Sequence, residues 1–305
     1  WVIGGIMPDR DWIIIIVLGF LWGTSFFFNE VLLREMGPLG VSFARVTMAA
    51  VFCWAWLFAT GCNPRVDLQL MPKFAFMGVM MFAIPFAVYP IGQQYVASGV
   101  AGIVNALTPV MVVIVSHFWP GGERATLLKS LGVLAGFVGI SLLTARAFAT
   151  QDQSQVWGTL LIILAPVSYA VAMNYVRRLY SINVTIVLAW SFSFAAMLML
   201  PVTVLFEGLP SSLSLATWAA IAILGCILTG ASFLVAFRIL PRAGATKTST
   251  VTFIAPVSAV LIGYFVLQEE LGALHFAGMG AIFVGLLLID GRMFRRWSTG
   301  PVSPD

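Results

Sequence analysis

Several polar and aromatic side chains interrupt long uncharged stretches of this chain, at positions where aliphatic residues would suffice for a structural helix. Tryptophan and tyrosine combine a flat face for stacking with a polar group, while serine, threonine and asparagine offer hydrogen bonds without charge. Together such groups could bind a neutral or zwitterionic small molecule with an apolar side chain. The candidate binding residues are Trp22, Ser25, Tyr89, Asn105, Thr108, Ser168, Tyr169 and Thr252.

Each of these residues also has a purely structural interpretation, and the sequence leaves both open. A serine or threonine in a membrane helix usually donates its hydroxyl hydrogen bond to a carbonyl one turn earlier. Trp22 could pack against another helix or stack on a bound molecule, although tryptophan generally prefers the membrane interface. The hydroxyls of Tyr89 and Tyr169 need partners when buried, and Asn105 could bridge two helices through its amide.

The sequence does not support catalysis or metal binding. A serine hydrolase needs a base such as histidine beside its nucleophile, but His117 and His275 both fall near the ends of apolar stretches. The His-Glu-x-x-His pattern of metalloproteases and the glycine loop that cradles phosphates are missing. We therefore expect no catalytic residue, no metal site, no cofactor and no enzyme activity.

The composition places the chain in a lipid bilayer. Hydrophobic residues make up 60% of it, charged residues only 9%, and the mean hydropathy is +1.00. A soluble domain carries roughly 25% charged residues, so this chain could not cover its surface with polar groups. The net charge of +4 comes without a basic run with interleaved aromatics, so we expect no nucleic-acid partner.

Charged residues mark the ends of ten apolar stretches, each close to the ~20 residues that a membrane-spanning helix needs. The run from Lys73 to Glu123 is long enough for two spans, hinged around Gly92–Gly99. All connections are short, which predicts an all-α integral membrane protein of ten transmembrane helices. The predicted spans are 11–30, 45–65, two within 73–123, then 127–145, 156–176, 184–206, 215–237, 244–267 and 271–289.

The basic residues predict the orientation, because lysine and arginine accumulate on the cytoplasmic side. With the N-terminus inside, thirteen of the sixteen lie in cytoplasmic segments. Only Arg34, Arg45 and Arg146 fall outside these segments. We therefore expect both termini in the cytoplasm and the protein in the inner (plasma) membrane.

The second half of the chain repeats the first. Because each half holds five spans, an odd number, the second must enter the membrane upside down. Inverted repeats of this kind are typical of carriers that bind their substrate near the bilayer midplane. We expect two inverted five-helix repeats, residues 11–145 and 156–290. The matched pairs are Pro109 and Pro256 and Glu123 and Glu270 (both 147 apart), Gly132 and Gly278 and Gly139 and Gly285 (both 146 apart), and Gly99 and Gly244 (145 apart).

These features resemble the drug/metabolite transporter superfamily, in particular its ten-span branch built from two EamA-type repeats. The second acidic junction departs from the usual Gly-Glu of the family. The resemblance implies a membrane exporter of amino acids or other small metabolites, and the composition is similar to that of the aromatic amino-acid exporters. The residues that carry it are Trp22-Gly23-Thr24-Ser25, Arg45, Pro109, Pro256, Gly122-Glu123-Arg124 and Gln268-Glu269-Glu270-Leu271.

The placement of charge narrows the expected substrate and mechanism. Taking Arg45 as the opening of span 2, no base lies at mid-depth, so a phosphorylated substrate would bury unpaired charge. All twelve acids lie near span ends, so we expect no buried carboxylate that couples transport to protons. Pro109 and Pro256 are candidate hinges, because each removes a helix hydrogen bond; the alternative is that they only bend their helices.

The sequence thus predicts an exporter of amino acids, preferentially aromatic and large apolar ones, that works by alternating access around a midplane cavity. Export of other neutral metabolites or drugs is the alternative within carriers, and a channel is the alternative from another class. The small-residue face of Gly132, Gly136 and Gly139 could pair two chains or pack within one. We expect a monomer whose partners are the lipid bilayer and its small-molecule substrate.

Overall fold

Long apolar stretches favour helices in lipid, because a helix satisfies its backbone hydrogen bonds within one segment. In the computed structural model, every regular element described is helical. The structure describes residues 9–149, 151–210 and 212–290, with the backbone alone for 9–12, 146–149, 240–250 and 252. Within these ranges, nine helices are long and apolar enough to cross a membrane, and the shorter apolar helix Phe253–Phe265 is a tenth candidate.

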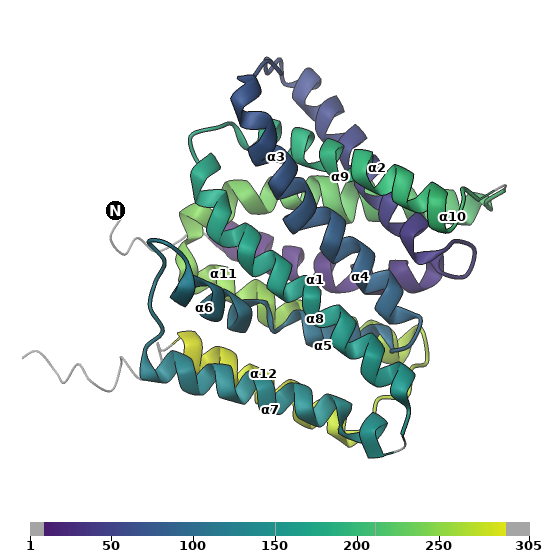
Figure 1. Cartoon of the computed structure of the whole chain (residues 1–305), viewed down its shortest axis with the longest axis vertical. Helices are drawn as coiled ribbons and strands as arrows, with labels where there is room; N and C mark the ends of the chain where they lie inside the picture. The colour runs from purple at the N-terminus through teal and green to yellow at the C-terminus, as the bar shows by residue number, and fades with distance from the viewer. Residues whose placement is uncertain (1–8, 150, 211, 291–305) are drawn as a thin grey trace, which may run out of the picture.

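The first half makes five passes (Figure 1). The uncharged run of residues 73–123 divides between Gln93 and Ser98 into two passes, as expected from the sequence. The elements of this half are α1 (Asp9–Leu32), α2 (Pro38–Ala59), η1 (Leu68–Leu70), α3 (Met71–Met77), η2 (Gly78–Ala83), α4 (Ile84–Gln93), α5 (Ser98–Asn105), α6 (Thr108–Phe118) and α7 (Leu127–Ala149).

The second half follows the same order of passes. Its third pass, like that of the first half, contains a π-helical segment. The elements are α8 (Gln153–Tyr175), η3 (Val176–Leu179), α9 (Val184–Phe206), α10 (Leu215–Ala222), η4 (Ile223–Ala231), α11 (Ser232–Phe265) and α12 (Ala273–Asp290).

Helix α11 contains two passes rather than one. Ser232 accepts a hydrogen bond from the indole of Trp22, and the hydroxyl of Ser258 donates to the carbonyl oxygen of Phe20. A straight helix would separate Ser232 from Ser258 by about 39 Å, yet their partners on α1 are two residues apart. The chain therefore reverses direction inside α11. Two separate spans were expected at 215–237 and 244–267, and the described backbone joins them without a loop.

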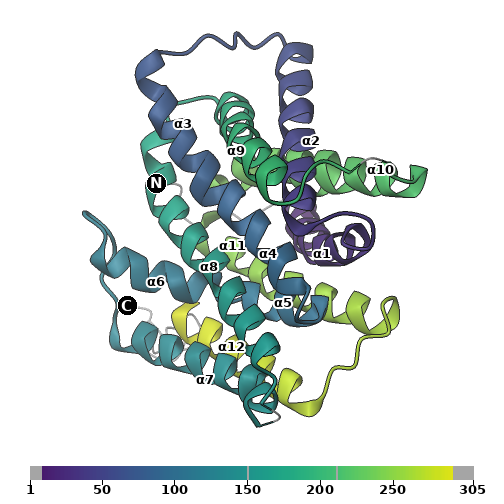
Figure 2. The same ribbon diagram turned by 45° about the vertical axis from the view of Figure 1, so that its right-hand side comes forward.

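The last pass of each half packs against the other, and the contacts are reciprocal. A Cβ at Gly132 would lie 2.6 Å from the carbonyl oxygen of Gly285, and one at Gly139 would lie 2.7 Å from that of Gly278. The repeat relates Gly132 to Gly278 and Gly139 to Gly285, so a two-fold operation exchanges the two contacts. Figures 1 and 2 both show α7 and α12 side by side. The two halves are thus inverted, and this glycine face packs within one chain.

The third passes show the same symmetry. Gly78 begins the π-helical segment η2, and Gly225, 147 residues later, lies in the π-helical segment η4. A Cβ at Gly78 would clash with the carbonyl oxygen of Ser191 in α9. One at Gly225 would clash with the Cβ of Met48 and lie 3.1 Å from the carbonyl oxygen of Arg45 in α2, so neither glycine has room for a side chain. Because π-helical turns shift the register of a helix and often occur at functional sites, both segments are relevant to the site.

The two largest buried apolar clusters join helices of both halves. One joins residues of α4, α5, α6 and α12 with parts of α1, α8 and α11. The other joins residues of α2, η2 and α9 with Phe233 of α11. Tyr169 of α8 packs against both clusters. Tyr169 therefore marks a place where the two clusters meet.

Candidate functional site

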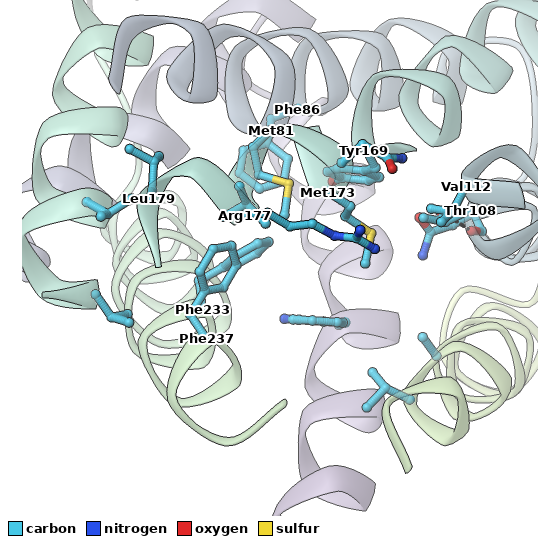
Figure 3. A pocket seen from close by; sticks show the side chains of 18 of the residues that line it. Met81, Phe86, Thr108, Val112, Tyr169, Met173, Arg177, Leu179, Phe233 and Phe237 are labelled. Carbon is cyan, nitrogen blue, oxygen red and sulfur yellow. Dashed lines mark hydrogen bonds between the residues drawn. The ribbon is translucent and has the colours of Figure 1, made fainter. Parts of the chain in front are cut away.

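A cavity of about 810 Å³ lies between the two apolar clusters. This volume is within the range of small-molecule sites, roughly 300–1,000 Å³. Its walls come from both halves, including α1, α2, α4, α5 and α6 from the first and α8, α9 and α11 from the second. Figure 3 shows Phe86, Tyr169, Phe233 and Phe237 around it. Apolar and aromatic side chains therefore form most of the wall.

Most residues selected from the sequence lie in this wall. Ser168 does not, because its hydroxyl donates to the carbonyl oxygen of Met80 at 2.6 Å and joins α8 to η2. Thr252 lies in α11, but its side chain is outside the described residues, although its neighbour Val251 lines the cavity. The six that line the cavity are Trp22, Ser25, Tyr89, Asn105, Thr108 and Tyr169.

Several of these polar groups already have partners within the protein. The hydroxyl of Tyr89 donates to Oδ1 of Asn105 at 2.6 Å, so this pair joins α4 to α5. Ser25 and Thr108 donate to carbonyl oxygens three residues earlier, as the structural interpretation anticipates. Trp22 has a partner within the protein and also faces the cavity: its indole N–H donates to Ser232 at 3.1 Å, and its ring lines the cavity.

Arg45 is the most informative residue that the sequence reasoning missed. It lies seven residues after the start of α2, about 10 Å into the helix. It is 5% exposed and lines the cavity. The expectation that Arg45 opens the second span is therefore wrong, because α2 begins at Pro38. Pro38 after Gly37 is a helix-start signal that places the beginning of α2 two turns earlier, and it could have corrected this error.

The surroundings of Arg45 fix its guanidinium but do not neutralise it. Its Nε donates to Oγ1 of Thr229 at 2.9 Å, and its Cζ lies 3.7 Å from the centre of the Phe86 ring. The hydroxyl of Thr229 donates to the carbonyl oxygen of Leu224 at 2.7 Å, five residues earlier in the π-helical segment η4. This segment thus turns an acceptor toward Arg45, and no carboxylate lines the cavity among the described residues.

Two further arginines lie where the cavity reaches exposed residues. Arg177 follows α8, and Figure 3 shows its side chain extending toward Met173. Arg238 of α11 donates to the hydroxyl of Thr185 at 3.0 Å. Both arginines and their neighbour Tyr180 are exposed, whereas Arg45 and Tyr89 are buried. The cavity therefore extends from a buried end to an open end at the α8–α9 junction.

The opposite end is closed by hydrogen bonds between elements. The carboxylate of Glu269 accepts the backbone N–H groups of Ser98 and Gly99, at the start of α5. Nearby, Asn29 of α1 donates to Gln93 of α4 at 2.9 Å. At the open end, Glu123 instead pairs with Lys129 in the first turn of α7. The cavity is thus closed at one end and accessible at the other.

The candidate hinges differ from each other. Pro109 stands in the first turn of α6, where the fourth pass is interrupted between Asn105 and Thr108 beside the cavity. Pro256 lies within the continuous helix α11. The two prolines match in sequence but not in helical context. Among the described residues, no group of three His, Cys, Asp or Glu could hold a metal ion.

Two inverted halves of membrane-spanning helices around a large shared cavity are the architecture of a secondary transporter. The chain belongs to the EamA-like transporter family, whose model matches residues 11–145 and again residues 156–290. It is a multi-pass membrane protein of this class.

The relatives agree with this assignment. The chain is 25% identical to the uncharacterized transporter YoaV of Bacillus subtilis, over 92% of this chain and 97% of YoaV. It is 23% identical to the uncharacterized inner membrane transporter YedA of Escherichia coli, over 88% of this chain and 87% of YedA. One solved crystal structure matches with a TM-score of 0.66 at 20% identity, over 92% of this chain and 97% of the other, which supports the fold alone.

Proposed function

We propose that this transporter exports amino acids, preferentially aromatic and large apolar ones, by alternating access around the central cavity. The observation that carries the proposal is Arg45, a buried cation that faces an aromatic cavity and has no acidic partner among the described residues. A guanidinium matches the geometry of a carboxylate, and it binds one through paired, charge-assisted hydrogen bonds. Aromatic walls such as Tyr169 and Phe233 suit an apolar side chain.

The ammonium group of an amino acid would need acceptors, because burying it unpaired is costly. Two amide oxygens in the wall can supply them. Oδ1 of Asn105 accepts one bond from Tyr89, and Oδ1 of Asn174 accepts one from Ser116 at 2.9 Å. A carbonyl-type oxygen has two lone pairs, so each can accept a second bond from a substrate.

The direction of transport follows from the proposed orientation of the chain in the membrane. With both termini cytoplasmic in the inner (plasma) membrane, the open end beside Arg177 and Arg238 faces the cytoplasm. The described state is then inward-facing, ready to load a cytoplasmic substrate. Pro109 and Pro256 would act as hinges when the halves exchange roles. A single chain suffices for this cycle, so we propose a monomer.

We propose that transport is not coupled to protons through a buried carboxylate. None of the described residues that line the cavity is an aspartate or a glutamate. Glu30 is the acid that tests this point, since it lies in the last turn of α1. Export would then follow the gradient of the substrate itself, or exchange one substrate for another.

Export of another neutral metabolite or drug is the second candidate, and the wide, mostly apolar wall favours it. A channel is the candidate from another class. Counterflow separates them. Proteoliposomes loaded with unlabelled phenylalanine receive labelled phenylalanine outside, without any ion gradient, and the uptake of labelled substrate is measured. Saturable uptake that requires internal substrate supports an amino-acid carrier, whereas flux that does not saturate supports a channel.

Substitutions in the cavity wall test whether the substrate passes through the cavity. Trp22→Ala and Tyr169→Ala should each weaken counterflow, whereas Arg65→Gln, an exposed base outside the cavity, should not. Absence of counterflow with every amino acid tested, while neutral drugs or metabolites are carried, would replace the leading proposal with the second candidate.

A further inference from the structure

The charges around the cavity are one-sided. Arg45 lies inside it and Arg177 and Arg238 lie at its open end, while no aspartate or glutamate is among the described residues that line it. In surroundings of low dielectric constant, such an excess attracts anions and repels cations. The carboxylate of a zwitterionic substrate is attracted by these arginines, but its ammonium is repelled. An anionic substrate is attracted and carries no group that is repelled.

The free donors of Arg45 are placed for one carboxylate. A guanidinium has five N–H donors, and the hydrogen bond to Thr229 uses only the one on Nε. Phe86 lies over a face of the guanidinium, 3.7 Å from its Cζ, so this contact does not use the in-plane donors of the Nη atoms. No hydrogen bond from either Nη atom to another described residue is found. Two parallel donors in one plane are the arrangement that a carboxylate accepts.

Thr229 fixes the orientation of the Arg45 guanidinium. Its own hydroxyl proton is directed to the carbonyl oxygen of Leu224, so its lone pair is left to accept from Arg45. In a regular α-helix, a serine or threonine hydroxyl normally bonds to the carbonyl oxygen three or four residues back. Thr229 instead bonds to the carbonyl oxygen five residues back, which the wider π-helical turn brings within reach. The π-helical segment η4 therefore positions Thr229, and Thr229 positions Arg45.

For the amino group of a substrate, by contrast, the described residues of the wall offer no dedicated partner. Both amide oxygens that could accept from an ammonium, on Asn105 and Asn174, already accept one hydrogen bond within the protein. Without a carboxylate, burial of an ammonium is compensated only in part. The part of the substrate that the cavity recognises by charge is thus its carboxylate.

We propose that the cavity is an aromatic carboxylate site, and that the transporter carries aromatic acids lacking an amino group at least as well as the matching amino acids. This inference rests on the proposed function, in that it takes the same cavity as the transport site. It extends the substrate class from zwitterionic amino acids to organic anions with an aromatic ring.

A series of compounds that share a phenyl ring but differ in charge tests the inference. Phenylalanine counterflow by the reconstituted protein is measured in the presence of one competitor at a time. The competitors are the anion phenylpyruvate, the cation phenethylamine and the neutral alcohol 3-phenylpropanol. Direct uptake of labelled phenylpyruvate is measured beside protein-free liposomes. Phenylpyruvate should inhibit at no higher concentration than unlabelled phenylalanine. Phenethylamine should need at least about tenfold more, the loss expected for a missing charged hydrogen bond.

Arg45→Lys keeps the charge and loses the paired donors, so inhibition by phenylpyruvate should weaken at least about tenfold, while inhibition by 3-phenylpropanol stays constant. Thr229→Val should act in the same direction, and Thr229→Ser should restore inhibition, which a merely structural role would not do. Arg65→Gln serves as the control. A misfolded variant is recognised by loss of the counterflow itself, whereas remaining counterflow that the neutral alcohol still inhibits shows a folded cavity.

The outcomes separate the inference from the proposed function. Phenylalanine counterflow that phenylpyruvate does not inhibit overturns the inference and leaves the amino-acid proposal standing. Uptake of phenylpyruvate without flux of any amino acid supports the inference and overturns the amino-acid proposal. Stronger inhibition by phenethylamine than by phenylpyruvate overturns the inference, since it shows that the cavity prefers cations.

Discussion

Glu269 accepts the backbone N–H of Gly99 at 2.9 Å, and it accepts that of Ser98 at 2.7 Å. Gly99 corresponds to Gly244 in the repeat, and Glu123 corresponds to Glu270, the residue after Glu269. Gly99 lies at the start of α5, whereas Gly244 lies inside the continuous helix α11. In this state only one junction is described in contact with a helix start, at the closed end of the cavity. A negative charge at the first turn of α5 is stabilising, because the unpaired N–H groups of a helix start favour anions.

Removing this charge should loosen the closed end. Glu269→Gln weakens two charge-assisted hydrogen bonds, so amide hydrogen exchange at Ser98 and Gly99 should become about tenfold faster. Glu270→Gln is the matched control, because Glu270 is exposed and one residue away. Equal exchange rates at the start of α5 in the two variants would show that Glu269 does not hold this end.

The reciprocal glycine contacts predict a large loss of stability on substitution. A Cβ at Gly139 would lie 2.7 Å from the carbonyl oxygen of Gly278, whereas a Cβ at Gly280 meets nothing within 4 Å. Gly139→Ala should therefore lower the unfolding free energy by about 1–3 kcal/mol, the usual cost of overpacking. Thermal unfolding of the detergent-solubilised protein measures this loss. A lower Tm for Gly280→Ala than for Gly139→Ala would contradict the packing of α7 on α12.

Asn105 should distinguish substrates with and without an amino group. If its Oδ1 accepts from the substrate ammonium, Asn105→Leu should raise the half-saturation concentration for phenylalanine several-fold. The value for phenylpyruvate should not change. Concentration-dependent counterflow of the two labelled substrates checks this. An equal rise for both would mean that Asn105 acts through its bond to Tyr89 instead.

Glu35 should contribute stability that depends on pH. The backbone N–H and the hydroxyl of Ser214 donate to its carboxylate, which holds the pKa of Glu35 below its ordinary value. Because the pKa is depressed in the folded state, the stabilisation is present above the unfolded pKa and is lost as the pH falls through the folded pKa. The Tm difference between the native protein and Glu35→Gln should shrink on acidification from neutral pH to below about pH 4. A difference that grows on acidification would have the wrong sign.

Glu30 tests the absence of proton coupling. Glu30→Gln should leave phenylalanine counterflow unchanged, because this residue is not part of the cavity wall. Uptake driven by an imposed pH gradient is the complementary measurement. Accumulation in the native protein that disappears in Glu30→Gln would overturn the proposal of transport without a carboxylate switch.

The sequence predicts the fold well, because the constraints that produce it are strong and local. Uncharged stretches must be helices in lipid, and an odd number of spans in each half forces inversion. The reversal inside α11 is the exception, since the chain makes it without a polar loop. Gly132 and Gly139 could be singled out as a packing face, but only the structure pairs them with Gly285 and Gly278.

The site is predictable only in part, because depth and rotation are set by packing. Trp22 and Tyr169 stand out as aromatic residues far from span ends, and both line the cavity. Ser168 has the same sequence signal but bonds to Met80. Arg45 was misplaced because charge was taken as a span boundary, whereas its cost in the membrane is offset by Thr229, Phe86 and access to the cavity.

Photo-crosslinking tests most directly the central claim that the substrate binds between the two halves. Benzoylphenylalanine, an aromatic amino acid with a photoreactive ketone, is added to the reconstituted protein, irradiated and mapped by mass spectrometry. The account predicts labelling of Met173 and Met81 in the cavity wall, suppressed by excess phenylalanine. Met197, which is 67% exposed and lies outside the cavity, is the internal control. Labelling of Met197 but not of Met173 or Met81, unaffected by phenylalanine, would contradict the cavity as the transport site.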